Sequence, residues 1–532
     1  MIEADIIVVG AGISGLTAAY KLLKKNQSLR VLVLEAKDRV GGRTLTVTLK
    51  TSNLQTDQFD LGGQWVSSSQ LHILRLLQEL NLTTYLQYDA GYKIGQGSAS
   101  VFEKYSTSFP SFGSYYSCYE LGQFVSKIEK MSKEVSLVDP FSSTFSKEMD
   151  SITMETLLLR HLSTKMAQDI MRTLIRVTFG TEASQLSALY FLAFSNGTHG
   201  LLSQFSSSLN GARELRIKGG AQQIALELSV KIGKECIILN TPVTEIEQSE
   251  NGVRVSTRFG KIYRSKYIIV ALPPTEVHRI LFNPSLSLKH RQLLQRYPVG
   301  HLTKFIITYP KAFWREKGFS GEVLSYGGGK VERGCDAGPI SATYDATTHH
   351  GHPAIVGYMA SKSGVQWNSK DTSCRKQSVL ETLSYFWGDW VHDPIDYVEK
   401  NWGEEAYVGG CPTHGMSPGM MVWFHQIRTP FGRIYWAGTE TATRWCGYMD
   451  GAVQAGERAA LEVLYKFQPQ TLTAADLDVI DLQVRRSSFI HPPPDPHIFR
   501  WTLCLPLFLI AMGWAAYTLR RHFWVIGVGR IA

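Results

Sequence analysis

Residues 4–35 alternate between apolar runs and a glycine-rich turn in an order that few folds produce. Residues 4–10 predict a buried strand, because its centre at 6–9 is apolar and β-branched. The turn GAGISG follows at 10–15, residues 16–25 have helical periodicity, and residues 29–34 predict a second strand that ends at Glu35. This strand–helix–strand order is a βαβ unit, which builds a parallel sheet.

The glycines of this turn have distinct roles in such a unit. Gly10 allows the tight turn, Gly12 lets the backbone approach a pyrophosphate, and Gly15 lets the helix pack closely on the strand. Ser14 lies at the predicted helix N-terminus, where N–H groups and partial positive charge suit phosphates. Glu35, 20 residues after Gly15, suits ribose hydroxyls. The motif predicts a dinucleotide, but by itself does not separate FAD from NAD.

Composition narrows the class of protein further. A chain of 532 residues predicts two or three domains. The net charge of +9 comes from 55 basic and 46 acidic residues without a long Lys/Arg run, so we expect no nucleic-acid partner. The seven cysteines are scattered, with no CxxC pair or Cys/His spacing. We therefore expect no metal site and no disulfide framework, which fits a reducing compartment.

The C-terminal segment differs from the rest of the chain. Residues 501–519 form a run of 19 without a charge, after a proline-rich stretch at 491–496 and with arginines on both sides. About 20 apolar residues span a bilayer as a helix. The segment therefore predicts a single membrane anchor, with a buried core helix or an interfacial segment as the alternatives. The apolar run near the N-terminus is too short for a signal peptide.

Two blocks after the βαβ unit distinguish FAD from NAD. RVGGRT at 39–44 combines close backbone approach with Arg43, which can pair with phosphate. FDLGGQW at 59–65 contains Gly62. Both resemble flavin-contacting blocks of the FAD-dependent amine oxidase superfamily.

Residues 434–460, IYWAGTETATRWCGYMDGAVQAGERAA, form a third block. It predicts a strand at 434–437, a turn at Gly438 and Thr439, and an Ala-rich helix over 451–465. The N-terminus of such a helix would stabilise negative charge on the pyrimidine edge of a reduced flavin. This block is similar to that of the monoamine oxidases themselves.

The segment NWGEEAYVGGC at 401–411 strengthens this resemblance. Monoamine oxidases have a similar segment ending in Ser-Gly-Gly-Cys, whose cysteine forms a thioether to the flavin 8α-methyl group. The resemblance therefore implies covalent FAD at Cys411; without it, a lone cysteine is usually an inert thiol. It also implies cofactor contacts from Val243, Trp402, Tyr407, Tyr448 and Met449.

The resemblance covers nearly the whole chain and implies a mixed α/β and α+β fold. We expect a Rossmann-like FAD-binding domain from residues 1–85, 210–295 and 400–466. It would be interleaved with a mixed-sheet substrate domain from 86–209 and 296–399. Residues 467–500 would be a linker before the transmembrane anchor at 501–519. The resemblance also implies attachment to the mitochondrial outer membrane, facing the cytosol, although the charge pattern fits the endoplasmic reticulum as well.

Two catalytic residues carry over from the family. Lys304 matches the lysine that holds a water near flavin N5; a lysine in an apolar strand is otherwise usually a surface residue. Tyr448 matches one wall of the aromatic cage through which the amine reaches the flavin; its alternative is an ordinary core tyrosine.

The chain departs from the family at the cage and in the substrate cavity. Monoamine oxidases have a second cage tyrosine directly after the flavin cysteine, where this chain has Pro412. Trp423 or Phe424 are candidates to replace it. Ala342 matches a bulky gate residue and Phe205 another gating position, and the family's cavity glutamine is not evident at 210–213. We expect a reshaped or roomier pocket and altered specificity.

These observations together predict oxidative deamination of an amine, with O₂ giving peroxide. Polyamine or N-methyl amine oxidation is an alternative, although no set of carboxylates for a polyamine is visible. A flavin-binding membrane protein with weak or lost activity is a second alternative, and a soluble NAD dehydrogenase a third. The natural amine stays open, as does a homodimer.

Overall fold

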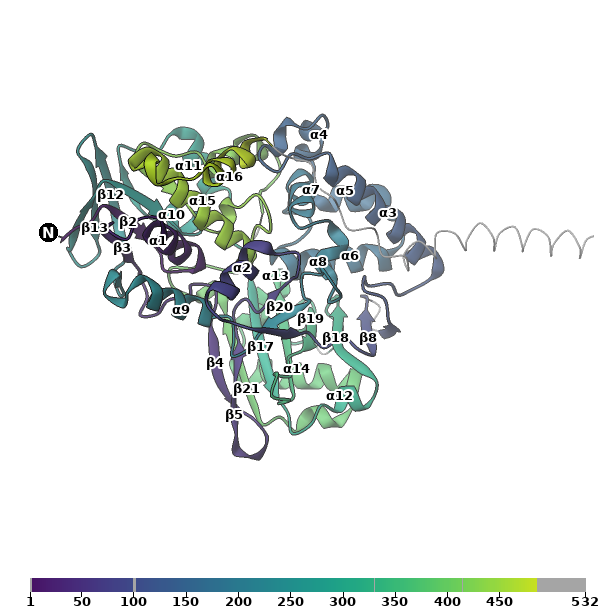
Figure 1. Ribbon diagram of the computed structural model, residues 1–532. Coiled ribbons are helices and arrows are strands. Elements are labelled where there is room, and N and C mark those ends of the chain that lie inside the picture. The colour runs from purple at the N-terminus through teal and green to yellow at the C-terminus, as the bar shows by residue number, and fades with distance from the viewer. Residues whose placement is uncertain (1, 99–101, 330, 414, 486–532) are drawn as a thin grey trace, which may run out of the picture.

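The computed structural model describes residues 2–98, 102–329, 331–413 and 415–485 (Figure 1). A five-stranded parallel sheet joins segments that are far apart in the sequence, and its strands are nearly all buried. Both faces of the sheet are therefore covered, as is usual for parallel sheets. In spatial order its strands are β11 (Ile237–Ile238), β3 (Val31–Leu34), β2 (Ile6–Val9), β15 (Tyr267–Val270) and β22 (Ile434–Trp436).

Two helices from opposite ends of the described chain, α1 (Ile13–Lys25) and α15 (Met449–Phe467), pack against each other (Figure 1). A Cβ atom added to Gly456 of α15 would lie 2.3 Å from the Ser14 carbonyl oxygen, so only glycine permits this approach. The N-terminal turn and the C-terminal block are thereby held together. On their other sides α9 (Gln223–Ile232) contacts α1, and α2 (Leu71–Glu79) contacts α15.

The predicted βαβ unit is confirmed, with shifted boundaries. The helix begins at Ile13, three residues earlier than expected, because Gly12 serves as its extended N-cap and its carbonyl accepts a hydrogen bond from Leu16 N at 3.0 Å. The strand and helix predicted after residue 434 are also present, and α15 extends two residues beyond the predicted range at each end.

The structure has three further sheets besides the parallel sheet and a large mixed sheet. One five-stranded sheet contains β1 (Ile2–Glu3), β14 (Ile262–Ser265), β13 (Gly252–Thr257), β12 (Val243–Ser249) and β16 (Leu281–Asn283). A three-stranded sheet contains β6 (Trp65–Val66), β10 (Leu215–Ile217) and β7 (Thr84–Leu86). The third is the hairpin of β4 (Thr46–Lys50) and β5 (Thr56–Asp60). Two short helices, α10 (Pro274–Val277) and α11 (Leu288–Gln295), follow β15.

A seven-stranded mixed sheet forms the second large unit. All pairs but β18 with β8 are antiparallel. In spatial order it contains β21 (Asp396–Asn401), β17 (Leu302–Thr308), β20 (Ala354–Ala360), β19 (Ala342–Asp345), β18 (Phe319–Ser325), β8 (Tyr92–Gln96) and β9 (Phe102–Tyr105). Apolar residues of α14 (Thr372–Trp387) and α12 (Phe313–Glu316) share a buried cluster with it; α13 (Ser361–Asn368) follows β20.

Helices from the middle of the chain form a layer beside the mixed sheet (Figure 1). They are α3 (Tyr115–Lys133), α4 (Ser146–Ser151), α5 (Met154–His161), α6 (Lys165–Phe179), α7 (Ala188–Gly197) and α8 (Leu201–Phe205). The two predicted domains therefore correspond in kind to a parallel and a mixed sheet, while their exact boundaries stay predictions.

The segment predicted as a linker begins with ordered structure. α16 (Ala474–Arg485) lies within 467–500, and its Asp476 pairs with Lys25 of α1. The first part of the predicted linker thus contains a helix that this ion pair and contacts with α15 hold on the core, while the bounds of the linker stay a prediction. Among the described residues, no helix combines the length and apolarity needed to cross a membrane. The predicted anchor at 501–519 lies outside the described residues.

Candidate active site

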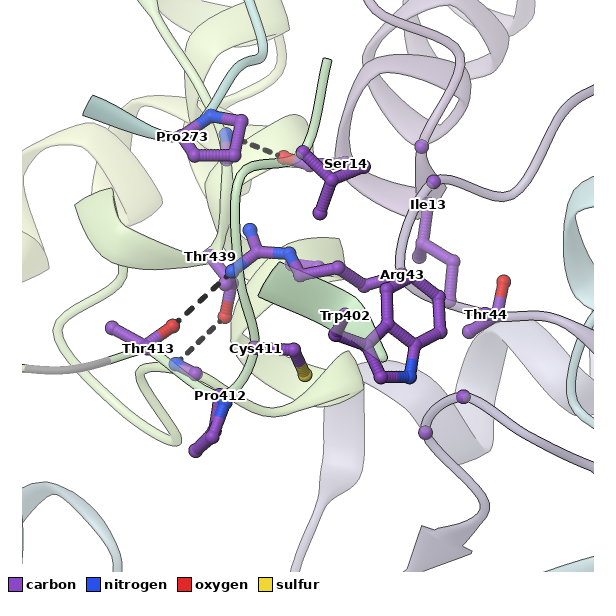
Figure 2. Close-up of a pocket in the computed structure, with 18 of the residues that line it drawn as sticks. Ile13, Ser14, Arg43, Thr44, Pro273, Trp402, Cys411, Pro412, Thr413 and Thr439 are labelled. Carbon is purple, nitrogen blue, oxygen red and sulfur yellow. Dashed lines mark hydrogen bonds between the residues drawn. The ribbon is translucent and has the colours of Figure 1, made fainter. Parts of the chain in front are cut away.

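A cavity of about 470 Å³ runs from the glycine turn to the mixed sheet (Figure 2). Its wall brings together most of the residues predicted from the sequence. They are Gly10, Gly12, Ser14, Glu35, Arg43, Gly62, Phe205, Val243, Lys304, Trp402, Tyr407, Cys411, Pro412, Gly438, Thr439, Tyr448 and Met449. Gly15 and Ala342 do not line it.

Two glycines of the turn have different roles, one in packing and the other in facing the cavity. A Cβ atom on Gly15 would lie 2.0 Å from the Gly10 carbonyl oxygen, so Gly15 serves helix–strand packing. A Cβ atom on Gly12 would meet no protein atom within 4 Å, and Gly12 faces the cavity. The Ser14 hydroxyl accepts a hydrogen bond from Gly438 N at 2.8 Å, which joins the first and last cofactor blocks.

Glu35 lies at the edge of the same cavity and is held by backbone N–H groups. Its carboxylate accepts hydrogen bonds from Ala11 N at 2.6 Å and Lys37 N at 2.9 Å. Burial raises the pKa of Glu35, and these two hydrogen bonds act in the opposite direction. The side chain is thus fixed where the motif places a ribose.

Arg43 has a partner that the sequence did not reveal. Its guanidinium donates two hydrogen bonds to Glu440, at 2.6 and 3.1 Å, and one to the Thr413 hydroxyl at 3.3 Å. Figure 2 shows it directed toward Thr413, close to Cys411. Arg43 is thus paired with Glu440 and braces the loop that carries the cysteine. It also lines the cavity, and its pairing with phosphate stays a prediction.

Cys411 is positioned by backbone pairing with the segment before β17. Its N–H donates to the Gly300 carbonyl at 3.0 Å, and Gly300 N donates to the Pro412 carbonyl at 2.8 Å. The thiol lines the cavity and has no disulfide partner among the described cysteines. Burial raises its pKa, opposed by the charges of Arg43 and Lys304. A second cysteine, Cys446, lines the same cavity, and burial raises its pKa to about 11.

Lys304 is buried in the strand β17 and faces the cavity. Its ammonium donates to the Gly62 carbonyl at 2.8 Å and to Gln64 Oε1 at 2.5 Å. Burial lowers its pKa to about 7, with the charge of Asp60 acting in the opposite direction. A neutral amine that donates both N–H groups in this way keeps a lone pair with which it can accept a hydrogen bond from water.

Aromatic rings line the cavity around Lys304 and Tyr448. The Lys304 ammonium lies 5.9 Å from the Trp65 ring centroid and 5.8 Å from that of Tyr358. The Tyr448 ring lies 6.2 Å from Phe194, which also lines the cavity, and is backed edge-on by Trp445, outside the wall, at a centroid distance of 5.0 Å. An aromatic wall beside Tyr448 therefore exists despite Pro412.

The two candidates for replacing the second cage tyrosine do not belong to this wall. Phe424 packs against Tyr190 and Tyr297, and Trp423 lies under Lys289; neither lines the cavity. That expectation is wrong, because both residues belong to a short helical segment that packs on α11.

The expectation for Ala342 is also corrected. Ala342 is fully buried in β19, paired with Leu324 and Tyr358 in the strand core, so its small size does not enlarge the cavity. Tyr344, two residues later on the same strand, does line it. The sequence also missed Arg213, which lines the cavity within the segment searched for a glutamine. The neighbours of Arg213 in the sequence are two small residues and a glutamate, and this pattern is equally typical of an arginine on the surface.

The parallel sheet with its glycine turn, and the second sheet that closes the cavity, define a dinucleotide-dependent oxidoreductase. Residues 13–464 match the family model of the flavin containing amine oxidoreductases. The chain is 36% identical over 464 residues to the probable flavin-containing monoamine oxidase A of Dictyostelium discoideum, covering 86% of this chain and 97% of that protein. It is 36% identical to amine oxidase [flavin-containing] A of Canis lupus familiaris, covering 86% and 85%.

Solved structures of two amine oxidases are also similar to this chain. Putrescine oxidase bound to putrescine matches with a TM-score of 0.79 and 26% identity over 87% of this chain and 99% of that one. Cyclohexylamine oxidase from Brevibacterium oxydans IH-35A matches with a TM-score of 0.80 and 25% identity over the same shares. The chain belongs to the flavin-containing amine oxidoreductase family, and it is an FAD-dependent amine oxidase resembling the monoamine oxidases.

The described residues fit this cofactor. Gly12 leaves open space at the N-terminus of α1 for a pyrophosphate, and Glu35 is available to a ribose. The cavity continues from there to Cys411, Lys304 and Tyr448, so the redox-active ring would lie beside all three.

Proposed function

We propose that this enzyme deaminates amines with a single amino group, using FAD bonded covalently to Cys411. The observation that carries the proposal is that Cys411, Lys304 and Tyr448 share one cavity wall that is continuous with the dinucleotide turn. A bound flavin supplies the acceptor for the hydride that leaves the carbon next to nitrogen.

The protein's own groups orient the amine and manage protons. The rings of Trp65, Tyr358 and Tyr448 exclude water and favour an amine with an apolar body. Lys304 is neutral above its pKa of about 7, so the lone pair of its Nζ atom can hold a water. Hydrogen bonds to the Gly62 carbonyl and to Gln64 Oε1 fix the position of this Nζ atom. Such a water is suited to hydrolyse the imine to an aldehyde.

The cavity gives little support to a polyamine substrate. Among the described lining residues the acidic ones are Glu35 and Glu276. Glu35 is bound beside the glycine turn, and Glu276 lies in α10, close to the loop at Gly409. A second ammonium near the aromatic wall would therefore lack the carboxylate that it needs. The solved relative that binds putrescine supports the fold rather than this substrate for the present chain.

The C-terminal segment supports a membrane location. We propose that residues 501–519 anchor the enzyme in a membrane, with the mitochondrial outer membrane and a cytosolic catalytic part as the preferred address. The support is the uncharged length of the segment and the arginines that flank it.

Acid precipitation tests the covalent bond. Forming the thioether removes one hydrogen from the Cys411 thiol and one from the flavin methyl group, and the O₂ of the oxidase reaction takes up the pair as peroxide. We expect the yellow colour of the purified protein to stay with the acid-precipitated pellet. Cys411→Ala should release it to the supernatant, whereas Cys446→Ala, which removes the other thiol of the cavity, should not. Release from the wild type would refute the bond.

A further inference from the structure

Arg213 is a buried cation on the wall of the catalytic cavity. Its exposed fraction is 8%, and it lies directly after Ala212, which also lines the cavity. The guanidinium donates to the Tyr344 hydroxyl at 2.5 Å and to the Phe205 carbonyl, and it lies 4.4 Å from the Tyr344 ring centroid. Within the part of the chain that the structure describes, its Nε atom has no hydrogen-bond partner. The side chain thus has a fixed position and unused donor capacity.

The acids near Arg213 lie outside the cavity wall. Glu322 is 3.8 Å from Arg213 and accepts a hydrogen bond from the Tyr105 hydroxyl at 2.9 Å. Glu322 and Asp89 are also paired with Lys93, at 3.5 and 3.0 Å. Neither acid lines the cavity. A molecule inside it therefore meets the guanidinium and no carboxylate at this position.

Two rings lie between Arg213 and Lys304. Arg213 contacts Tyr344, whose ring meets Trp65 edge-on at a centroid distance of 5.2 Å, and Trp65 lies beside Lys304. All four residues line the cavity. An amine whose nitrogen lies near Lys304 and whose apolar body follows these two rings would place its far end against Arg213.

We propose that Arg213 determines specificity by binding a carboxylate at the far end of the substrate, so that the preferred substrates are amines with an apolar body and a remote anionic group. The inference rests on the proposed function, because it places the reacting amine near Lys304. Arginine binds carboxylates through several parallel N–H bonds, and the low-polarity wall strengthens the interaction. The same charge repels the second ammonium of a diamine.

The test compares phenethylamine with para-carboxyphenethylamine as substrates of the full-length holoenzyme. We expect kcat/KM to be at least about tenfold higher for the carboxylated amine, which corresponds to one good charge-assisted interaction. In Arg213→Gln this ratio should fall to about one, and Arg213→Lys should restore part of it. Arg216→Gln is the matched control: Arg216 is buried in β10, three residues after Arg213, but does not line the cavity, so its loss should leave the ratio unchanged.

A ligand that is not oxidised separates this inference from the proposed function. Phenylpropionate should perturb the flavin absorption of the wild type and bind at least about tenfold more weakly to Arg213→Gln. Turnover of phenethylamine without any preference for the carboxylated amine would overturn the inference and leave the proposed function intact. If no amine is oxidised but phenylpropionate binds through Arg213, the anion site stands and the proposed function fails. Equal binding by wild type and Arg213→Gln would overturn the anion site.

Discussion

The chemistry of Lys304 depends on burial more than on any partner. A lysine that faces an apolar cavity loses the hydration that stabilises its charged form, which is why its pKa falls from 10.5 to about 7. Two acceptors, Gly62 and Gln64, hold the nitrogen, but neither carries a formal charge. The neutral form is therefore available near physiological pH, as accepting a hydrogen bond from water requires.

This shift has a consequence for stability. Between pH 7 and 10.5 the unfolded chain keeps the proton on Lys304 while the folded protein does not. Stability should therefore rise with pH across this window. Lys304→Met has no group that titrates at this position, so its stability lacks this pH dependence. The wild type should therefore gain about 2–5 kcal/mol of unfolding free energy relative to the variant between pH 7 and 10.5. Urea unfolding of both proteins over this range measures it; a constant difference would contradict the shifted pKa.

At the scale of single residues, the sequence predicted the positions of several site residues but not the contacts that those residues make. The positions of Cys411, Lys304 and Tyr448 followed from motifs, and all three line the cavity. The pairing of Arg43 with Glu440 was not predictable, because the two residues are 397 positions apart in different blocks. Arg213 and Ala342 were misjudged for the same reason: whether a side chain reaches a cavity depends on how the strands pack, which local pattern does not specify.

At the scale of elements, the glycine turn makes a prediction from geometry alone. Gly15→Ala forces a Cβ atom to within 2.0 Å of the Gly10 carbonyl oxygen, so it should lower the stability of flavin-depleted protein by about 1–3 kcal/mol. Gly12 has φ −73°, which alanine adopts, and open space around it. Gly12→Ala should therefore change that stability by less than about 0.5 kcal/mol but reduce flavin uptake.

Thermal unfolding of flavin-depleted protein and the flavin content after expression distinguish these two effects. A Gly12→Ala variant that takes up flavin normally would show that the pyrophosphate does not approach this glycine. A Gly15→Ala variant as stable as the wild type would contradict the close packing of α1 on the parallel sheet.

Elements with local signatures were predictable, and elements defined by pairing were not. The βαβ unit and the final strand and helix were found because glycine turns and apolar periodicity occur within short windows. The order of the seven-stranded sheet was not, since β8 and β18 pair across more than 200 residues. Likewise α16 was taken for linker, because the contact of Asp476 with Lys25 is not visible in its own sequence.

At the scale of the whole molecule, our proposal that residues 501–519 anchor the enzyme in a membrane makes a prediction about where the enzyme resides. We expect full-length protein to sediment with membranes and to need detergent for release. A chain truncated after residue 485 should stay in the supernatant with its flavin, because the described cavity lies wholly within the remaining residues. Fractionation of cells that express each form measures this. Full-length protein in the soluble fraction would contradict the anchor.

The same anchor allows a charge test. Replacing two central apolar residues of 501–519 by lysine should abolish membrane association, because each buried charge costs about 2.5–3.5 kcal/mol of insertion free energy. Two conservative changes, such as leucine to isoleucine, should leave the protein in the membrane fraction. Membrane binding that survives the lysines would point to a surface of the catalytic part instead.

The central claim is that this enzyme transfers electrons from an amine to its flavin. Mixing the purified holoenzyme with an aromatic monoamine in the absence of oxygen tests it most directly. The account predicts that the visible flavin absorption bleaches, that oxygen restores it with release of peroxide, and that putrescine at the same concentration bleaches it at least about tenfold more slowly. A flavin that dithionite reduces but no amine does would contradict the claim.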